Sequence, residues 1–154
     1  MLGLVAFGAV FFKQNSEKQL NESIQCTQTR LEDRMSCYKE LAEHEKRPEL
    51  CDKLTPLFLK DNCTDRVARS LSNINLCAKV LTEEIRNYCY STIAKQKKDA
   101  SLCELIKNSE RKDTCYFDFI SIVQDKSYCE KINKLEFREG CLHNIDAYKK
   151  LQSR

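Results

Sequence analysis

Ten cysteines are the residues of this chain best suited to chemistry, and their spacing is regular. They are Cys26, Cys37, Cys51, Cys63, Cys77, Cys89, Cys103, Cys115, Cys129 and Cys141. From Cys51 onward the gaps alternate between 12 and 14 residues, which gives a strict period of 26, and a slightly shorter copy precedes it. This regularity indicates an internal repeat with two cysteines in each of five units.

Three chemistries could use these thiols: disulfide bonding, storage of cuprous ions on a cysteine-lined bundle, and free thiol chemistry. Metal sites usually need close pairs such as CxxC, and no two cysteines here are closer than 11 positions. An even number of evenly spaced cysteines behind an apolar start favours disulfides in an oxidising compartment. We therefore predict five disulfides, no metal site and no cofactor.

Pairs of short helices must position these cysteines. Glycine (3) and proline (2) are scarce, which favours helices. Apolar residues recur immediately before the first cysteine of a unit, three after it and four after the second cysteine, on the cysteine's helical face. They are Leu50, Leu76, Leu102 and Tyr128; Leu54, Val80, Ile106 and Ile132; and Leu41, Val67, Ile93, Phe119 and Ile145.

The unit at residues 100–125 shows the predicted order of elements. We expect a short helix over 101–106, a turn over 107–110 and a second helix over 111–123, with Asp125 or Ser127 capping the next unit. The second helix is the most apolar of its kind, which predicts the centre of the stack or a contact surface. Its apolar residues are Phe117, Phe119, Ile120, Ile122 and Val123.

Two disulfide pairings respect the period. Pairing within units joins Cys103 to Cys115, and the midpoint at 109 lies in the predicted turn, which puts both cysteines at one height on antiparallel helices. Pairing between units joins Cys115 to Cys129. The midpoint of that pair lies inside a helix, so the two sulfurs would be at different heights, and Cys26 and Cys141 would have no partner. Geometry favours the within-unit pairs Cys26–Cys37, Cys51–Cys63, Cys77–Cys89, Cys103–Cys115 and Cys129–Cys141.

A basic residue stands three positions before every second cysteine: Arg34, Lys60, Arg86, Lys112 and Arg138. An acid or amide usually follows the basic residue. We expect these polar positions to form a solvated face with local ion pairs that each contribute little to stability.

Residues 1–12, MLGLVAFGAVFF, contain no polar side chain, and Lys13 ends the run. As a helix they cover about 18 Å, which is shorter than a bilayer span of about 20 residues. A basic region and a cleavage site typical of a signal peptide are not visible. An incidental, truncated membrane anchor is one explanation, and an assembly surface that buries large apolar side chains is the other. The residues of that surface are Leu2, Leu4, Val5, Phe7, Val10, Phe11 and Phe12. The small residues between them, Gly3, Ala6, Gly8 and Ala9, allow close helix packing.

The predicted fold class is all-α. An apolar N-terminal helix and stalk (1–23) lead into an α-solenoid of five short disulfide-stapled helical hairpins (24–151), followed by a tail (152–154).

The segments SLCELI…RKDTCY…I (101–120) and NLCAKV…RNYCYSTIA (75–94) resemble cysteine-paired helical-hairpin repeats of secreted or membrane-anchored proteins from poorly characterised archaea and bacteria. The resemblance covers residues 24–151 and implies a repeat type rather than an activity. More loosely, the apolar N-terminal helix is similar to that of type IV pilin-like subunits. It departs from them because the run is short and no acidic residue follows its first positions.

Nothing in the motifs points to an enzyme: the sequence has no glycine-rich phosphate loop, HExxH or nucleophile elbow. The histidines, His44 and His143, are expected on the surface. The interleaved net charge of +3 argues against nucleic-acid binding.

We therefore predict a structural subunit of an extracellular filament or pilus-like appendage. Its partners are copies of itself, with a membrane contact through residues 1–12 before assembly. The alternative is a membrane-anchored solenoid that binds another protein, and both hypotheses place the chain outside the cell or at its surface. Asn21 and Asn62 each begin an N-x-S/T motif and are candidate glycosylation sites.

Overall fold

The computed structural model describes Cys26, Thr27 and residues 30–152, and every regular element in this part of the chain is a helix. The predicted N-terminal helix and stalk, the assembly residues between Leu2 and Phe12, and Asn21 lie outside the described residues.

Long helices alternate with short ones along the chain. The long helices are α2 (Leu31–His44), α3 (Leu57–Ser70), α5 (Glu83–Lys97), α6 (Ser109–Val123) and α7 (Leu135–Gln152). The short ones are the 3₁₀ helices η1 (Pro48–Lys53), η2 (Ala100–Leu105) and η3 (Lys126–Lys131) and the single turn α4 (Ile74–Cys77). Each short helix holds the first cysteine of a unit, and the long helix after it holds the second.

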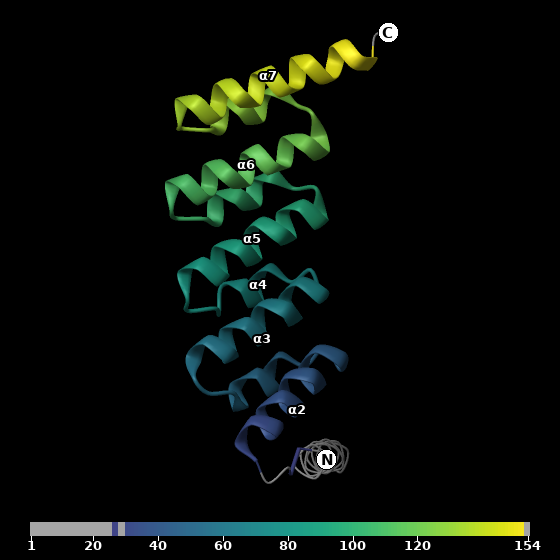
Figure 1. Ribbon diagram of the computed structural model, residues 1–154, viewed down its shortest axis with the longest axis vertical. Coiled ribbons are helices and arrows are strands. Elements are labelled where there is room, and N and C mark those ends of the chain that lie inside the picture. Colours follow the sequence, from purple (N-terminus) through teal and green to yellow (C-terminus); the bar gives the residue numbers. More distant parts are fainter. Residues whose placement is uncertain (1–25, 28–29, 153–154) are drawn as a thin grey trace, which may run out of the picture.

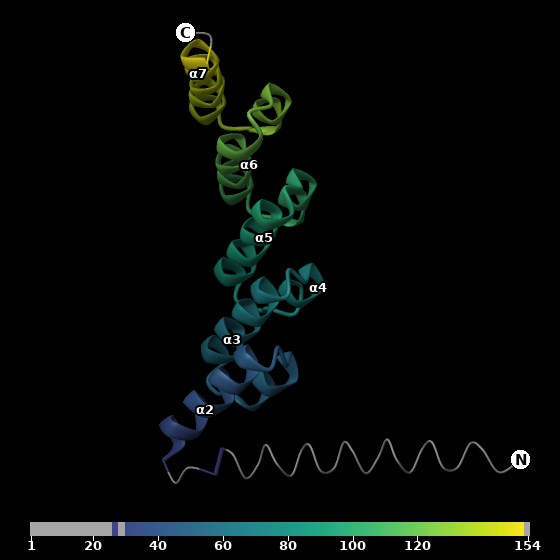
Figure 2. The same cartoon turned by 90° about the vertical axis from the view of Figure 1, so that its right-hand side faces the viewer.

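The hairpins stack in chain order into an elongated array, with the described N-terminal part at one end and α7 at the other (Figure 1). The long helices lie along one side, and α4 and the 3₁₀ helices lie along the other (Figure 2). Successive long helices contact one another from α2 to α7. The array is therefore two layers thick, and contacts join neighbouring units, as in a solenoid.

Each of the five disulfides closes one hairpin, the pairing that the midpoint argument favours. The Cα atoms of the pairs are 5.6–5.8 Å apart, within the usual range for a disulfide. The apolar residues at the repeated positions pack around the bridges. Leu54, Val80, Ile106 and Ile132 are buried, as are Leu41, Val67, Ile93, Phe119 and Ile145. Bridge and apolar neighbours form one continuous core.

In the fourth hairpin the long helix begins earlier than predicted. Its long helix α6 begins at Ser109, so the predicted turn over 107–110 is too long by two residues. The reason is Asn108, whose Oδ1 accepts a hydrogen bond from the Arg111 N–H at 3.0 Å and caps the helix two residues earlier. The prediction for the next cap is confirmed, because Asp125 Oδ1 accepts from the Ser127 N–H at 2.9 Å.

The turns that follow α2, α3, α5 and α6 share one feature, at the position nine residues after the cysteine of the helix. The residue there is left-handed although it is not glycine: Lys46, Ser72, Lys98 and Gln124 have φ of 55°, 48°, 54° and 54°. After α3 and α5, Asn73 and Asp99 donate their N–H groups to carbonyls five residues back, at Ala68 and Ala94, as in a Schellman motif. The side chains of Asn73 and Asp99 then cap the next short helix, so one repeated turn sets the direction of each following hairpin.

Replacing Lys98 with glycine tests this turn. A left-handed lysine carries a steric cost that glycine does not, so we expect Lys98→Gly to raise the free energy of unfolding by roughly 0.5–1 kcal/mol. The neighbouring Lys97→Gly is the matched control, and because Lys97 lies in the helix, that change should lower it by a similar amount. Chemical denaturation of both variants measures the difference, and a loss of stability in Lys98→Gly would contradict this account of the turn.

Candidate interaction surface of the repeat array

All ten cysteines are in disulfides, so no thiolate of this chain is left to attack a substrate or bind a metal. Five bridges indicate an oxidising environment. Within the described residues, no group of His, Cys, Asp and Glu side chains could hold a metal ion. His44 and His143 are both exposed. The surfaces of the array, rather than its cysteines, are therefore where function must be sought.

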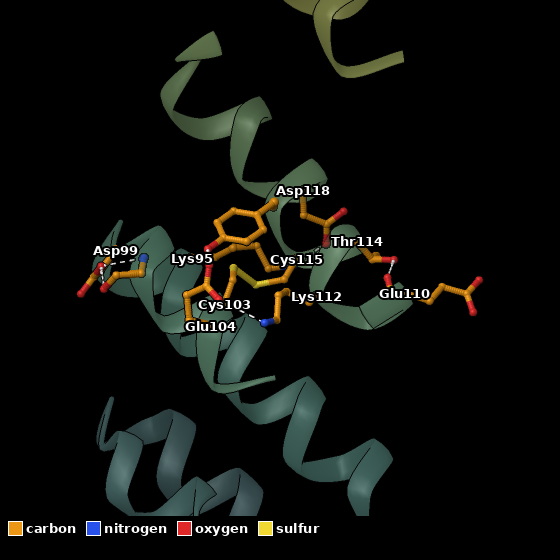
Figure 3. The surroundings of a disulfide bond; sticks show 11 residues. Lys95, Asp99, Cys103, Glu104, Glu110, Lys112, Thr114, Cys115 and Asp118 are labelled. Atoms are coloured by element: carbon orange, nitrogen blue, oxygen red, sulfur yellow. Dashed lines mark hydrogen bonds and ion pairs between the residues drawn. A yellow bond between two sulfur atoms is a disulfide. The ribbon is translucent and has the colours of Figure 1, made fainter. Parts of the chain in front are cut away.

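The fourth hairpin contains a polar cluster beside its bridge (Figure 3). The Tyr116 hydroxyl donates to Glu104 Oε1 at 2.5 Å, and Lys112 Nζ lies 3.0 Å from Glu104 Oε2. These two hydrogen bonds lower the pKa of the Glu104 carboxyl. Burial and then the bond to Glu104 raise the pKa of Tyr116. The phenol is thus held protonated at neutral pH, and the cluster joins the short helix to the long one.

The basic position before each second cysteine has two roles. Lys60 and Lys112 form the expected ion pairs, with Asp52 at 2.7 Å and with Glu104. Arg34 is exposed as expected, whereas the other two arginines do not fit the expectation of a solvated face. Arg86 donates to the Val80 carbonyl at 2.9 Å, and Arg138 donates to the Ile132 carbonyl at 2.8 Å. Their guanidinium groups reach backward and satisfy carbonyls of the loop that enters the same helix.

Buried carboxylates connect one hairpin to the next, which corrects the expectation that the acid or amide after each basic residue lies on a solvated face. Asp61 accepts hydrogen bonds from the backbone N–H groups of Leu81 and Thr82 at 3.2 and 2.7 Å and from the Thr82 hydroxyl at 2.6 Å. Asp113 accepts from the N–H groups of Asn133 and Lys134 at 2.9 and 2.8 Å. Each carboxylate therefore holds the loop that leads into the long helix of the following hairpin.

The repeat contains the pattern that could have revealed these contacts. Asp61, Asn87 and Asp113 all stand two positions before a second cysteine, and all three are buried. In the first hairpin the same position is Met35, and the loop of the second hairpin contains Pro56, which has no N–H to donate. A unit thus has a polar side chain at this position when the loop of the next hairpin has N–H groups to donate to it.

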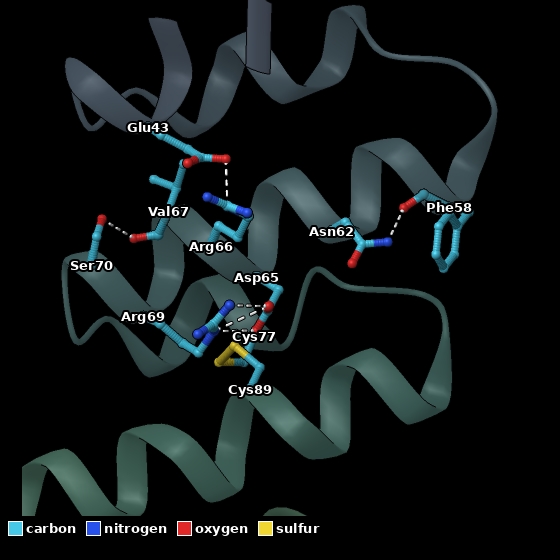
Figure 4. Close-up of polar contacts among 10 residues, drawn as sticks. All are labelled: Glu43, Phe58, Asn62, Asp65, Arg66, Val67, Arg69, Ser70, Cys77 and Cys89. Carbon is cyan, nitrogen blue, oxygen red and sulfur yellow. Dashed lines mark hydrogen bonds and ion pairs between the residues drawn. A yellow bond between two sulfur atoms is a disulfide. The ribbon is translucent and has the colours of Figure 1, made fainter. Parts of the chain in front are cut away.

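Further polar contacts join the exposed sides of the long helices. Arg66 Nε lies 2.6 Å from Glu43 Oε1, which links α3 to α2 (Figure 4). Arg69 pairs with Asp65 on its own helix at 2.8 Å and lies 5.1 Å from the centre of the Tyr88 ring on α5. Lys95 on α5 pairs with Asp118 on α6 at 3.0 Å. The pairs between helices, Arg66 with Glu43 and Lys95 with Asp118, are partly exposed, so each contributes little to stability.

The outward face of the fifth hairpin differs from the corresponding faces of the inner ones. The second hairpin buries Asp61, Asp65 and Ala68 at the positions that face the next unit. The fifth hairpin has Glu139, His143 and Asp146 at those positions, and all three are exposed. A polar outer face of this kind is typical of a capping repeat.

Two grooves lie between long helices near this end. The groove between α5 and α6 is about 320 Å³ and is lined mainly by polar side chains, among them Glu84, Arg111 and Asp118. The groove between α6 and α7 is about 230 Å³ and is largely apolar; its lining residues are Phe117, Ile120, Gln124, Asn144, Ile145 and Tyr148. The apolar character predicted for α6 is therefore divided: Phe119 and Ile120 are buried, whereas Ile122 and Val123 are each 40% exposed.

Asn62, the described glycosylation candidate, lies inside α3 (Figure 4). Its side-chain amide donates to the Phe58 carbonyl at 2.8 Å. The motif's third residue, Thr64, is buried and donates to the Lys60 carbonyl. The folded helix thus opposes modification here, and glycosylation stays a prediction for both sites.

Comparisons of the chain with family profiles, curated proteins and solved structures found no match. The structure itself shows the helical repeat architecture with one disulfide in each of five units. Within the described residues, no helix is long and apolar enough to cross a bilayer.

Removing an inter-hairpin carboxylate should destabilise the array. Asp61→Ala and Asp113→Ala each leave N–H groups of the next loop without their acceptor, so we expect a loss of about 2 kcal/mol in the free energy of unfolding. Glu139→Ala is the matched control, because it changes the same repeat position where the side chain is exposed. Its effect should stay within about 0.5 kcal/mol. Equal effects at all three positions, measured by urea unfolding, would contradict the role of these carboxylates in holding the next loop.

The Asp61 contribution should also depend on pH. Burial raises the pKa of this carboxyl, but the hydrogen bonds from Thr82 and Leu81 outweigh burial and lower the pKa overall. The contribution is therefore present above the unfolded pKa of about 3.9 and is lost as pH falls through the lower folded pKa. Unfolding curves at several pH values should show the difference between wild type and Asp61→Ala shrinking below about pH 4.

Proposed function

We propose that this protein is a non-enzymatic structural subunit of an extracellular filament or pilus-like appendage, and that copies assemble through residues 1–12. The observation that carries the proposal is the run of twelve residues without a polar side chain, joined to a disulfide-closed array. Burying apolar surface stabilises by about 25 cal/mol per Å². A run this apolar therefore favours a state in which partner copies or lipid cover it.

The array suits the outer body of such an assembly. In the chain-entropy account, each loop of about 12 residues closed by a disulfide contributes about 3 kcal/mol. Hairpins closed in this way keep their fold where chaperones and reducing agents are absent. This supports an extracellular or cell-surface location.

The charge distribution favours assembly through the apolar segment over direct stacking of arrays. Another hairpin placed on α7 would have to bury polar residues that are now exposed, Glu139, His143 and Asp146, and burying polar or charged groups without new partners is costly. Contact between residues 1–12 and a different surface of the next copy is heterologous, and heterologous contacts that do not close produce open helical polymers.

A second candidate function is a membrane-anchored solenoid that binds another protein. The polar groove between α5 and α6 favours it, because Tyr88 and Arg111 line that groove and Tyr88 is 57% exposed. Tyrosine and arginine are enriched among the residues that dominate protein–protein binding.

Deleting residues 1–12 separates these two functions. The described core and all five disulfides lie beyond the deletion, so the truncated chain should fold. A filament subunit should then become a soluble monomer that forms no fibres in electron micrographs, because it has lost its assembly segment. A binding module should instead stay able to bind its partner.

Two full-length variants control for the length of the chain. Val5→Lys with Val10→Lys places charges within the apolar run and should abolish fibres as the deletion does. Lys13→Ala changes a residue outside the run and should leave fibres intact. Fibres formed by the truncated chain would rule out assembly through this segment.

A further inference from the structure

We propose that the apolar groove between α6 and α7 binds residues 1–12 of a second copy of this chain. The inference rests on the proposed function and adds the surface that receives the assembly segment.

The chemistry of the groove fits an apolar segment. Two aromatic and two isoleucine side chains line it, and its polar residues, Gln124 and Asn144, are uncharged. Its volume of about 230 Å³ is below the 300–1,000 Å³ usual for small-molecule sites. The groove therefore suits a few side chains of a peptide better than a cofactor.

The apolar surface continues beyond the groove along α7. Tyr148 is 47% exposed and Leu151, one turn further on, is 71% exposed. Ile122 and Val123 lie near the end of α6 on the other side, each 40% exposed. A segment longer than the groove itself would cover part of this surface as well.

The assembly segment has the spacing of a helix that binds in a groove. Leu4, Phe7 and Phe11 stand at i, i+3 and i+7, so they form one stripe if the segment is helical as the sequence predicts. A helix that binds in a hydrophobic groove uses large side chains at these intervals as anchors, and the rest of this segment is apolar as well. The small residues Gly3 and Gly8 leave room for close approach.

The length of the connection favours a second copy. In the predicted helix, residues 13–25 cover about 20 Å. The helices α2, α3, α5 and α6 contact in turn, and three spacings of about 8–10 Å separate the first from the last. The segment adds about 18 Å to this length. In the same copy only its first residues therefore extend as far as the groove, and Phe11, about 22 Å from Cys26 along the helix, falls short of it.

The first hairpin, to which the assembly segment is joined, and the groove lie towards opposite ends of the elongated array (Figure 2). The segment joins the array at Cys26, in the first hairpin, and the groove lies between the fourth and fifth. A contact that joins the segment of one copy to the groove of the next is heterologous, and it extends into a filament when successive copies do not close into a dimer or ring.

Mixing two incomplete variants tests the proposal. The chain without residues 1–12 keeps only the groove. The full-length chain with Asn144→Lys and Tyr148→Lys, whose side chains are exposed, keeps only the segment. Neither should assemble alone, and the mixture should form one-to-one complexes, measured by light scattering after size exclusion.

Leu135→Lys in the full-length chain is the matched control, since it is 61% exposed on the same helix and does not line the groove. It should form fibres as wild type does.

Fibres formed by the Asn144→Lys, Tyr148→Lys chain would overturn the groove as the receiving surface. If the truncated chain still failed to assemble, the proposed function would stand. Circular dichroism and intact disulfides in both variants exclude misfolding as the cause of lost assembly.

Cross-linking identifies the copy that fills the groove. A photoreactive phenylalanine analogue replaces Tyr148 in full-length chains, and equal amounts of ¹⁴N- and ¹⁵N-labelled protein are assembled together. We expect cross-links to the tryptic peptide of residues 1–13, and mixed-isotope pairs should make up about half of them. Cross-links confined to pairs of one isotope would show that each copy fills its own groove. Fibres without any cross-link to residues 1–13 would show that the segment binds elsewhere.

Discussion

One disulfide between a short helix and a long helix is the constraint on which the rest of this structure depends. Helices of four to six residues, such as α4 and η2, are too short to be stable alone. The bridge holds each against the longer helix that follows, and apolar residues such as Ile106 and Phe119 pack around it. Each hairpin is thereby a rigid unit, and the array gains its core by repeating that unit rather than by enlarging one.

Contacts between hairpins give the array a direction. The left-handed turn that ends four of the long helices always leads into the next short helix, and Asp61 and Asp113 each bind the loop of the hairpin that comes after their own. The two ends are therefore chemically different. The fifth hairpin faces outward with exposed charged and polar residues, whereas the apolar residues 1–12 are joined to the first. This asymmetry supports a head-to-tail assembly, in which the apolar segment of one copy binds a different surface of the next copy.

Some features of the surface were present in the sequence as patterns but needed the structure to be understood. Basic residues three positions before the second cysteine form a clear repeat, yet Lys60 pairs with Asp52 while Arg86 binds backbone carbonyls. The choice follows the side chain and not its acidic neighbour, because Arg138 also binds a backbone carbonyl although Glu130 follows the first cysteine of its unit. The boundary of α6 was misplaced for a similar reason, because the Asn108 cap outweighed the polar composition of its first turn.

The sequence by itself determined the number of units, the partner of each cysteine and the residues that surround each bridge. These are local properties: a separation of 12 residues places two cysteines at one height on a hairpin, and offsets of three and four place side chains on one helical face. The tertiary structure alone decided which polar groups are buried between hairpins and where the surface is hollow. The groove beside Phe117 and Tyr148 depends on how closely α6 and α7 approach. That spacing comes from the packing of whole hairpins, which no separation along the chain specifies.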